Sequence, residues 1–156
     1  MNLAKSNPPA DWPRISSAIV YDDLKGALDW LAKAFGFELR VLVQDGDGNI
    51  QHTEMEFGGG VIMLAGSGRP TTGGCSPKSQ SGHFTQSLMV FVDDVDAHYE
   101  CAKAAGAKIL EPPQNRDYGD RIYSCLDFEG HPWYFAQRVD QQAWDDSIAE
   151  FTVKKS

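Results

Sequence analysis

The chain has 156 residues, of which 42% are hydrophobic and 23% are charged, so its composition is that of one globular domain and excludes disordered and fibrous classes. Its 14 Lys and Arg against 22 Asp and Glu give a formal net charge of −8, which argues against nucleic acid or an anionic membrane as a partner. No apolar run approaches the ~18 residues of a membrane span, and the N-terminus lacks the pattern of a signal peptide. Three cysteines at unpatterned spacings are typical of a reduced protein. We therefore expect a cytoplasmic protein whose partner is a small, neutral or cationic molecule.

Two stretches about 70 residues apart share one order of features, which indicates an internal duplication. Residues 19–36 and 91–106 each give an apolar strand, an Asp-Asp step suited to cap a helix, a helical pattern and a closing glycine. The halves also end alike, because residues 56–65 align without a gap on residues 127–136. We therefore predict two copies of one βαβββ module.

The first module is predicted to span residues 14–66. Asp-Gly and Gly-Gly steps between strand-like runs indicate its hairpin turns. Its expected elements in chain order are a strand at 15–21, a helix at 24–35, and strands at 38–43, 50–57 and 61–65.

A linker rich in Gly, Ser, Thr and Pro is expected at residues 67–85, followed by the second module at residues 86–138. We treat residues 1–138 as one domain and residues 139–156 as a C-terminal helical tail, because Trp144, Ile148 and Phe151 fall at helical spacing. The expected elements of the second module are a strand at 87–92, a helix at 95–105, and strands at 108–110, 121–128 and 133–137.

The stretch from Tyr118 to Ala136 is the most specific motif in the chain. It reads YGDRIYSCLDFEGHPWYFA and resembles the YGDR…D-x-x-GH-x-W-x-F ending of the glyoxalase and bleomycin-resistance branch of the vicinal oxygen chelate superfamily, which also includes extradiol dioxygenases. The resemblance covers roughly residues 14–138. It implies an α+β fold in which two paired βαβββ modules form a cupped mixed sheet, with the helices outside and a ligand cleft inside. It also implies a homodimer that completes or doubles the cleft.

The resemblance allows metal binding to be examined position by position. Metal enzymes of this superfamily take His, Gln or Glu ligands from the first and last strands of each half. The corresponding positions in this chain are Ser17 or Ser16, Met63, Ser87 or Gln86, and Tyr134. Serine, methionine and a neutral phenol are poor ligands for a divalent ion, and Gln86 is at best one weak ligand. We therefore expect no metal and no other cofactor.

A competing metal set consists of His52, Glu54 and Glu56, which strand alternation places on one face. Their spacing spreads the three side chains over ~13 Å, which is too far for one ion to reach all of them. The simpler interpretation is a polar strand face that meets solvent or lines the cleft. His52 and Glu54 would then contact the ligand or, in an enzyme, act as a general base.

Aromatic and methionine side chains on the predicted strands indicate the character of the cleft. Alternation turns Trp133 and Phe135 toward the helices and leaves the other large side chains for the cleft. Such a lining suits a flat, largely apolar ligand with a polar or cationic group, although the same side chains would also fit the core of a closed sheet. The predicted ligand-binding residues are Ser17, His52, Glu54, Met63, Ser87, Met89, Phe91, Tyr123, Tyr134 and, at the rim, Arg121.

Three functions remain open on these residues. The favoured one is non-enzymatic binding of a small molecule without a metal, as in bleomycin-resistance proteins, because methionine-rich surfaces adapt to different ligands. The second is a metal-dependent lyase, isomerase or dioxygenase with ligands drawn from His52, Glu54, Glu56 or His131. The third is a metal-free enzyme with Glu54 or His52 as the general base.

Overall fold

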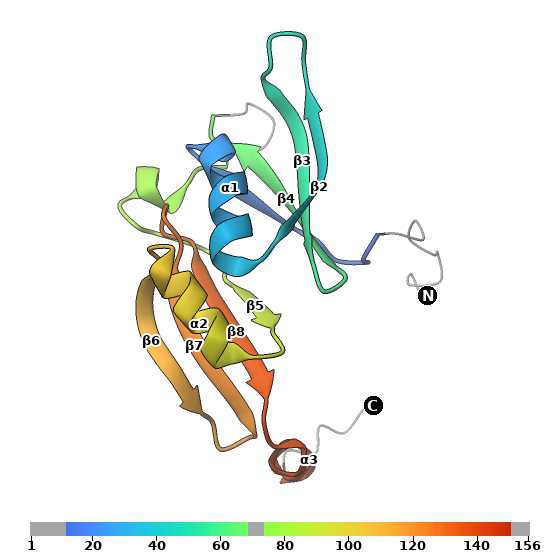
Figure 1. Ribbon diagram of the computed structural model, residues 1–156, viewed down its shortest axis with the longest axis vertical. Coiled ribbons are helices and arrows are strands. Elements are labelled where there is room, and N and C mark those ends of the chain that lie inside the picture. The colour runs from blue at the N-terminus through green and yellow to red at the C-terminus, as the bar shows by residue number, and fades with distance from the viewer. Residues whose placement is uncertain (1–11, 69–73, 151–156) are drawn as a thin grey trace.

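Two four-stranded mixed sheets, each with one helix, form the two halves of the computed structural model, which describes residues 12–68 and 74–150 (Figure 1). The first module contains β1 (Ser17–Tyr21), α1 (Leu24–Phe35), β2 (Glu38–Gln44), β3 (Ile50–Phe57) and β4 (Gly60–Gly66), with strand order β1-β4-β3-β2. The second contains β5 (Leu88–Phe91), α2 (Val95–Ala104), β6 (Lys108–Asn115), β7 (Asp120–Leu126) and β8 (Pro132–Arg138), with strand order β5-β8-β7-β6. A 3₁₀ helix, η2 (Pro77–Gln80), lies between the modules, and α3 (Gln141–Glu150) follows the second. The predicted α+β fold of paired βαβββ modules is confirmed.

The Asp-Asp steps cap both main helices as their sequence predicts. The Asp23 side chain accepts a hydrogen bond from the backbone N–H of Gly26, and the Asp94 side chain accepts one from Ala97. Gly36 closes α1 in the left-handed conformation, at φ 75°, which favours glycine. Each helix therefore begins and ends where local chemistry requires it, independently of the sheet beneath.

The two modules share one core, which lies between the helices and the sheets. α1 and α2 both lie in front of their sheets in Figure 1, and the Trp30 indole N–H donates to the Ala105 carbonyl at 3.0 Å. Phe35 at the end of α1 packs on Trp133 and Phe135 of β8. The sheet faces that lie away from α1 and α2 carry exposed side chains, among them Met89, Phe91 and Tyr134 of the second sheet. We call these sheet faces the open faces.

Most element boundaries differ from the sequence-based expectation by one or two residues, and the end of β6 differs by more. β6 extends to Asn115 although Pro112 and Pro113 lie within it, because β6 is an edge strand and its register shifts between Glu111 and Gln114. β1 begins at Ser17 rather than at residue 15. The C-terminal helix is present as α3, while Phe151 lies outside the described residues. In the described part of the chain, no helix is both long and apolar enough to cross a membrane.

Strand register corrects the alignment of the two halves by one residue. Ile19 pairs with Leu64, and Val90 pairs with Phe135, so the first strands of the modules correspond at an offset of 71 residues. The closing glycines of the two helices, Gly36 and Gly106, are 70 residues apart, so their offset does not apply to the first strands. Ser17 therefore corresponds to Leu88 and lies on the helix side of its sheet. A shift of one residue reverses the face of every side chain on a strand, so Ser17 lies on the helix side of β1, and Ser16, the alternative at this position, lies on the other side. Both serines line the pocket described below.

The alignment of β3 with β7 needs a one-residue correction in the opposite direction. Glu54 pairs with Met63, and Ser124 pairs with Tyr134, so these strands correspond at an offset of 70. The second hairpin has one more residue between its paired ends than the first, which restores the offset of 71 on β8. Tyr123 therefore corresponds to Thr53, a core position, and not to His52.

Candidate functional site

The open face of the second sheet carries large apolar side chains. Met89 and Phe91 on β5 are 52% and 53% exposed, and Tyr134, which pairs with Met89, is 38% exposed. Trp133 and Phe135 lie on the other face and are buried, so the predicted orientations on β5 and β8 are confirmed. An exposed apolar face of this kind, on a sheet otherwise packed on one side, indicates a surface that binds something.

A pocket of about 580 Å³ lies where the β3–β4 hairpin of the first module meets β5 of the second. Its volume is within the range of small-molecule sites. The Ser16 hydroxyl is buried there and has no hydrogen-bond partner in the described part of the chain, whereas the Ser17 hydroxyl accepts a hydrogen bond from Gln86 at 2.8 Å. Six of the lining residues are Ser16, Phe57, Gly58, Gly60, Met89 and Phe91.

This pocket exists because the first hairpin consists of glycines. Gly58 and Gly59 adopt positive φ values of 53° and 82°, which suits a two-residue hairpin turn and leaves no side chain at its tip. In the second module the equivalent hairpin carries Glu129 and His131, which correspond to Gly58 and Gly60 in the ungapped alignment.

We call residues 127–131 the clamp, because their side chains hold the first module. The Glu129 carboxylate accepts hydrogen bonds from the backbone N–H groups of Asp22 and Asp23, at 2.7 and 2.8 Å. The His131 ring donates through Nε2 to the Val20 carbonyl at 2.9 Å. The most specific motif of the sequence therefore joins the two modules, and His131 is held in that contact rather than on an open face.

Asp127 is the centre of the clamp. Its buried carboxylate accepts hydrogen bonds from the Tyr21 hydroxyl at 2.7 Å, the Trp133 indole N–H at 3.2 Å, and two backbone N–H groups of the clamp itself, those of Glu129 and His131. Burial, followed by the Asp127 charge, raises the pKa of Tyr21 well above its ordinary value, so the phenol stays protonated and donating.

A polar cluster lies on the open face of the first sheet. The Nε2 atom of His52 is 2.7 Å from Oε1 of Glu54, and the Nε atom of Arg40 is 3.3 Å from Oε2 of the same carboxylate. Val41 and Met63 flank Glu54 on the neighbouring strands. The predicted shared face of His52, Glu54 and Met63 is thus observed, with Glu54 held between a base and a cation.

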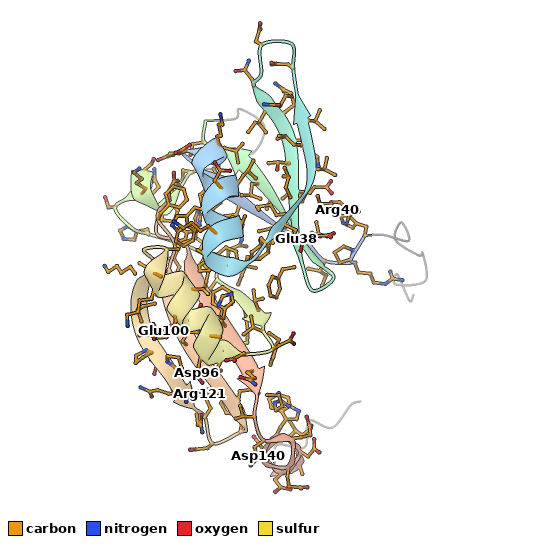
Figure 2. The ribbon with its side chains drawn as sticks, in the orientation of Figure 1. Glu38, Arg40, Asp96, Glu100, Arg121 and Asp140 are labelled. Carbon is orange, nitrogen blue, oxygen red and sulfur yellow. The ribbon has the colours of Figure 1, made fainter. Side chains whose placement is uncertain are left out.

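Arg40 is the member of this cluster that the sequence does not predict. The register of β2 shifts between Leu39 and Val41, so Arg40 is an extra residue in the strand and escapes simple alternation. Its guanidinium also lies 5.2 Å from the ring centre of Trp12. Figure 2 shows Arg40 beside the first sheet, far from Arg121 beside the second.

The metal positions of the resemblance do not fit a divalent ion. With the register corrected, the residues at those positions are Ser16 directly before β1, Met63 on β4, Ser87 directly before β5 and Tyr134 on β8, which offer hydroxyl, thioether and phenol groups. Glu54 is no better placed, because both of its oxygens already contact Arg40 and His52, and the guanidinium would repel a cation. Across residues 12–68 and 74–150, no group of three or more His, Cys, Asp or Glu could hold a metal ion.

Two predicted site residues lie on the wrong side of the second sheet for a cleft. Tyr123 is fully buried under α2, and its hydroxyl donates to Nδ1 of His98 at 2.6 Å. Burial raises the pKa of Tyr123, as expected for a core phenol. The predicted place of Tyr123 in the cleft lining is therefore wrong, and the physical cause is the one-residue offset described above.

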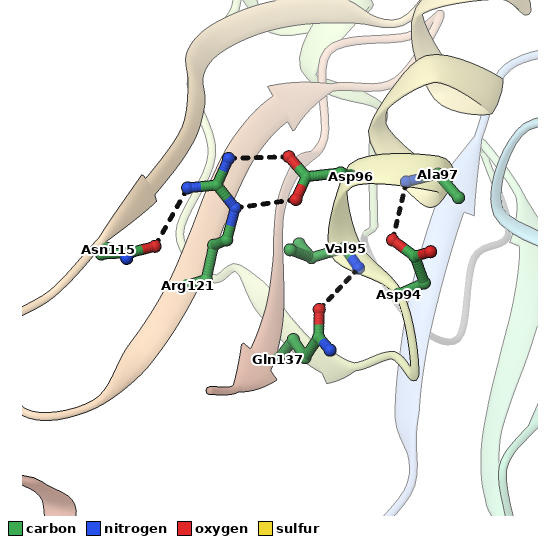
Figure 3. A network of polar contacts seen from close by, with 7 residues as sticks. All are labelled: Asp94, Val95, Asp96, Ala97, Asn115, Arg121 and Gln137. Carbon is green, nitrogen blue, oxygen red and sulfur yellow. Dashed lines mark hydrogen bonds and ion pairs between the residues drawn. The ribbon is translucent and has the colours of Figure 1, made fainter. Parts of the chain in front are cut away.

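Arg121 is also on the helix side, where it joins β7 to α2 (Figure 3). Its guanidinium donates through Nε and Nη2 to the Asp96 carboxylate at 2.9 and 2.7 Å, and through Nη1 to the Asn115 side chain at 3.0 Å. The hydrogen bond from Arg121 lowers the pKa of Asp96. Arg121 is thus part of a surface network beside the N-terminus of α2, not a rim residue of the cleft.

Of the remaining predicted positions, Ser87 is exposed at the start of β5 and lies beside a small gap against His131 and Trp133. At the far end of the second open face, Arg138 donates to Asp120 and packs over Trp144 of α3, 4.0 Å from the ring centre. α3 is therefore fixed at the end of that face.

Comparison with known proteins agrees with this arrangement. A sequence model of the family described as Glyoxalase/Bleomycin resistance protein/Dioxygenase superfamily matches residues 14–135. The chain is 30% identical over 135 residues to the uncharacterized protein Rv0887c of Mycobacterium tuberculosis, which covers 86% of this chain and 79% of that protein.

Solved structures give the same result. TioX from Micromonospora sp. ML1 is 36% identical and superposes with a TM-score of 0.67, covering 81% of this chain and 98% of TioX. The fosfomycin resistance protein FosX from Listeria monocytogenes is 15% identical, with a TM-score of 0.61 over 85% of this chain and 94% of FosX, which is a likeness of fold alone.

Proposed function

Since this chain belongs to the Glyoxalase/Bleomycin resistance protein/Dioxygenase superfamily, we propose that it is a metal-independent binding protein for a small, flat, largely apolar molecule. It acts as a cytoplasmic homodimer and sequesters its ligand without converting it. The observation that carries this proposal is the exposed apolar face formed by Met89, Phe91 and Tyr134, which adjoins the pocket below the glycine hairpin.

The chemistry of the open faces supports a flat ligand. An aromatic ring and two flexible apolar side chains on one pleated surface favour stacking and adapt to rings of different outline. The pocket adds depth beside Met89 and Phe91, and the Ser16 hydroxyl, which has no hydrogen-bond partner among the described residues, lies within it. A ligand bound here loses apolar surface to the protein and satisfies a buried polar group at the same time.

The homodimer follows from the same exposure. Each protomer has one polar open face and one apolar open face, and in the described part of the chain both carry exposed side chains. If the first sheet of one protomer covers the second sheet of its partner, both faces become the walls of one cup. Burial of the apolar face, at about 25 cal/mol per Å², then favours association.

The absence of a metal role rests on the donor set. The FosX structure is a complex with Mn(II) and a dihydroxypropylphosphonic acid, but this chain offers Ser16, Met63, Ser87 and Tyr134 on or directly before the corresponding strands. These side chains are suited to contact an organic ligand directly rather than through an ion.

The proposal is tested by titration calorimetry with flat aromatic probes, neutral 2-naphthol and cationic proflavine, into the intact protein. We expect saturable binding of at least one probe and about a tenfold loss of affinity in Phe91→Ser. Phe84→Ser is the matched control, because Phe84 is equally exposed, at 53%, but does not line the pocket that Phe91 lines. Absence of saturable binding, or an equal loss in both variants, would contradict the proposal.

Oligomeric state is measured separately by analytical ultracentrifugation. We expect a dimer for the wild type and for Phe84→Asp, and dissociation for Phe91→Asp, because a charge in the covered face opposes its burial. A wild-type monomer at micromolar concentration would contradict the dimer.

A further inference from the structure

We infer that His52 selects the ligands of this cup by accepting a hydrogen bond, through its Nδ1 atom, from a hydroxyl or N–H group of the bound aromatic molecule. This inference rests on the proposed function, because the first sheet, which carries His52, faces the apolar side chains of a second sheet only in the proposed dimer. Arg40 and Glu54 are positioning residues that act through His52.

The contact with Glu54 decides which nitrogen of the His52 imidazole carries the hydrogen. Nε2 of His52 lies 2.7 Å from Oε1 of Glu54, and a carboxylate can only accept a hydrogen bond. Nε2 therefore carries the hydrogen, and in the neutral ring the lone pair is on Nδ1. Within residues 12–68 and 74–150, Nδ1 of His52 makes no hydrogen bond.

The His52 ring is held by Glu54, which is held in turn by Arg40. The Glu54 side chain is only 9% exposed and uses both oxygens, one toward His52 and one toward Arg40. Arg40 is itself largely covered, at 16% exposure, beside Trp12. The His52 side chain is 43% exposed. Glu54 and Arg40, which are largely covered, therefore orient the accessible imidazole of His52.

The charges of Glu54 and Arg40 decide what charge the cluster presents to a ligand. A free Glu54 carboxylate would attract a cation, but the Arg40 guanidinium 3.3 Å away compensates its charge. In its neutral form, the His52 ring then offers its Nδ1 atom at the surface as an acceptor. The preferred ligand therefore carries a neutral hydroxyl or N–H donor on its flat apolar body, rather than a cationic group.

The experiment uses a matched pair of probes, 2-naphthol and 2-methoxynaphthalene, which differ in whether the oxygen can donate. Titration calorimetry on the wild-type protein is expected to give about tenfold tighter binding of 2-naphthol. In His52→Leu the two affinities become equal. The control is His83→Leu, because His83 is an exposed histidine of the linker and its loss leaves the preference unchanged.

The positioning role of Glu54 is measured by long-range proton–nitrogen NMR correlation on the imidazole of His52. The wild type and Glu56→Gln show hydrogen on Nε2 alone, whereas Glu54→Gln shows a mixture of tautomers and a reduced preference for 2-naphthol. Glu56 is the matched control, because it is an exposed glutamate on the same face of β3. The wild-type spectrum decides the inference even if Glu54→Gln is too unstable to study.

The outcomes separate the two proposals. Wild-type binding of both probes with equal affinity, or hydrogen on Nδ1 in the wild-type spectrum, overturns the role of His52 and leaves the proposed function intact. Failure of the wild type to bind 2-naphthol, 2-methoxynaphthalene or proflavine overturns the proposed function, and the role of His52 with it.

Discussion

The two modules have the same order of elements but use their last hairpins in opposite ways. In the second module, Asp127, Glu129 and His131 fill the hairpin and bind the end of β1 and the start of α1. In the first module, the hairpin is Gly58 to Gly60, and a pocket lies between it and β5. One copy of the hairpin thus stabilises the molecule, and the other leaves room for a ligand.

The open faces differ in the same way. The first sheet presents His52 and its two buried partners, whereas the second presents Met89, Phe91 and Tyr134. A cup built from one of each has a wall that hydrogen-bonds and a wall that stacks. The two modules therefore present two different surfaces rather than two copies of one site.

The largest expected effect comes from removing the centre of the clamp. Asp127→Ala leaves the buried donors of Tyr21 and Trp133 without an acceptor, so we expect a loss of about 4 kcal/mol in the free energy of unfolding. Urea denaturation measures it, with Glu56→Ala as the control at the first hairpin, where a change below about 0.5 kcal/mol is expected. Equal losses in the two variants would show that the hairpins are not specialised.

Glu129→Ala gives the second largest effect. It removes the acceptor of two backbone N–H groups at the start of α1, at an expected cost of about 2 kcal/mol in urea denaturation. Because the clamp lies apart from the pocket, the affinity for 2-naphthol stays unchanged. The control is Glu100→Ala, an exposed glutamate near Lys103 whose loss costs about 0.5 kcal/mol or less. A fall in ligand affinity without a fall in stability would reverse the roles assigned to the two hairpins.

Tyr134→Ala tests the stacking wall. We expect about a fivefold loss of 2-naphthol affinity by calorimetry, because an aromatic contact is removed from the open face. Tyr118→Ala is the matched control, since Tyr118 is equally exposed, at 37%, but lies against Trp144 of α3. An equal loss from Tyr118→Ala would move the binding surface to the end of the sheet.

The smallest effect concerns pH and the helices. His98 of α2 donates to the Phe35 carbonyl of α1, while the corresponding residue of α1 is the buried Ala27. Burial lowers the pKa of His98 below its ordinary value of 6.5, so the unfolded chain takes up a proton more readily than the folded one. Stability is therefore fully present above that value and falls as the pH drops below it.

Urea denaturation at about pH 7.5 and about pH 5.5 measures this dependence. The wild type loses more stability on acidification than His98→Gln does. A wild-type protein that becomes more stable at the lower pH would contradict the burial of a neutral His98.

The sequence was sufficient to predict the fold because the repeated pattern is local. Caps at Asp23 and Asp94, glycine-containing turns and alternating strands each specify their own segment, and the duplication joins them into two modules. The resemblance then supplied the pairing of the modules. These features predict the helices and most strands with small errors at their ends.

The site was predicted less well, because it depends on register rather than on pattern. A single-residue difference in the length of a helix or hairpin turned Ser17 and Tyr123 to the opposite faces from those expected. The shift in β2 brought Arg40 to Glu54, and no alternation rule anticipates an extra residue in a strand. The role of the clamp was also hidden, since only the folded chain brings Glu129 to the start of α1.

The central claim is that the cup binds an aromatic ligand directly, with no metal ion. The measurement that tests it most directly is calorimetric titration of 2-naphthol into protein purified without added metal, before and after treatment with a chelator, with elemental analysis of both samples. We predict no stoichiometric ion and one unchanged affinity. A stoichiometric ion whose removal abolishes binding would contradict the claim.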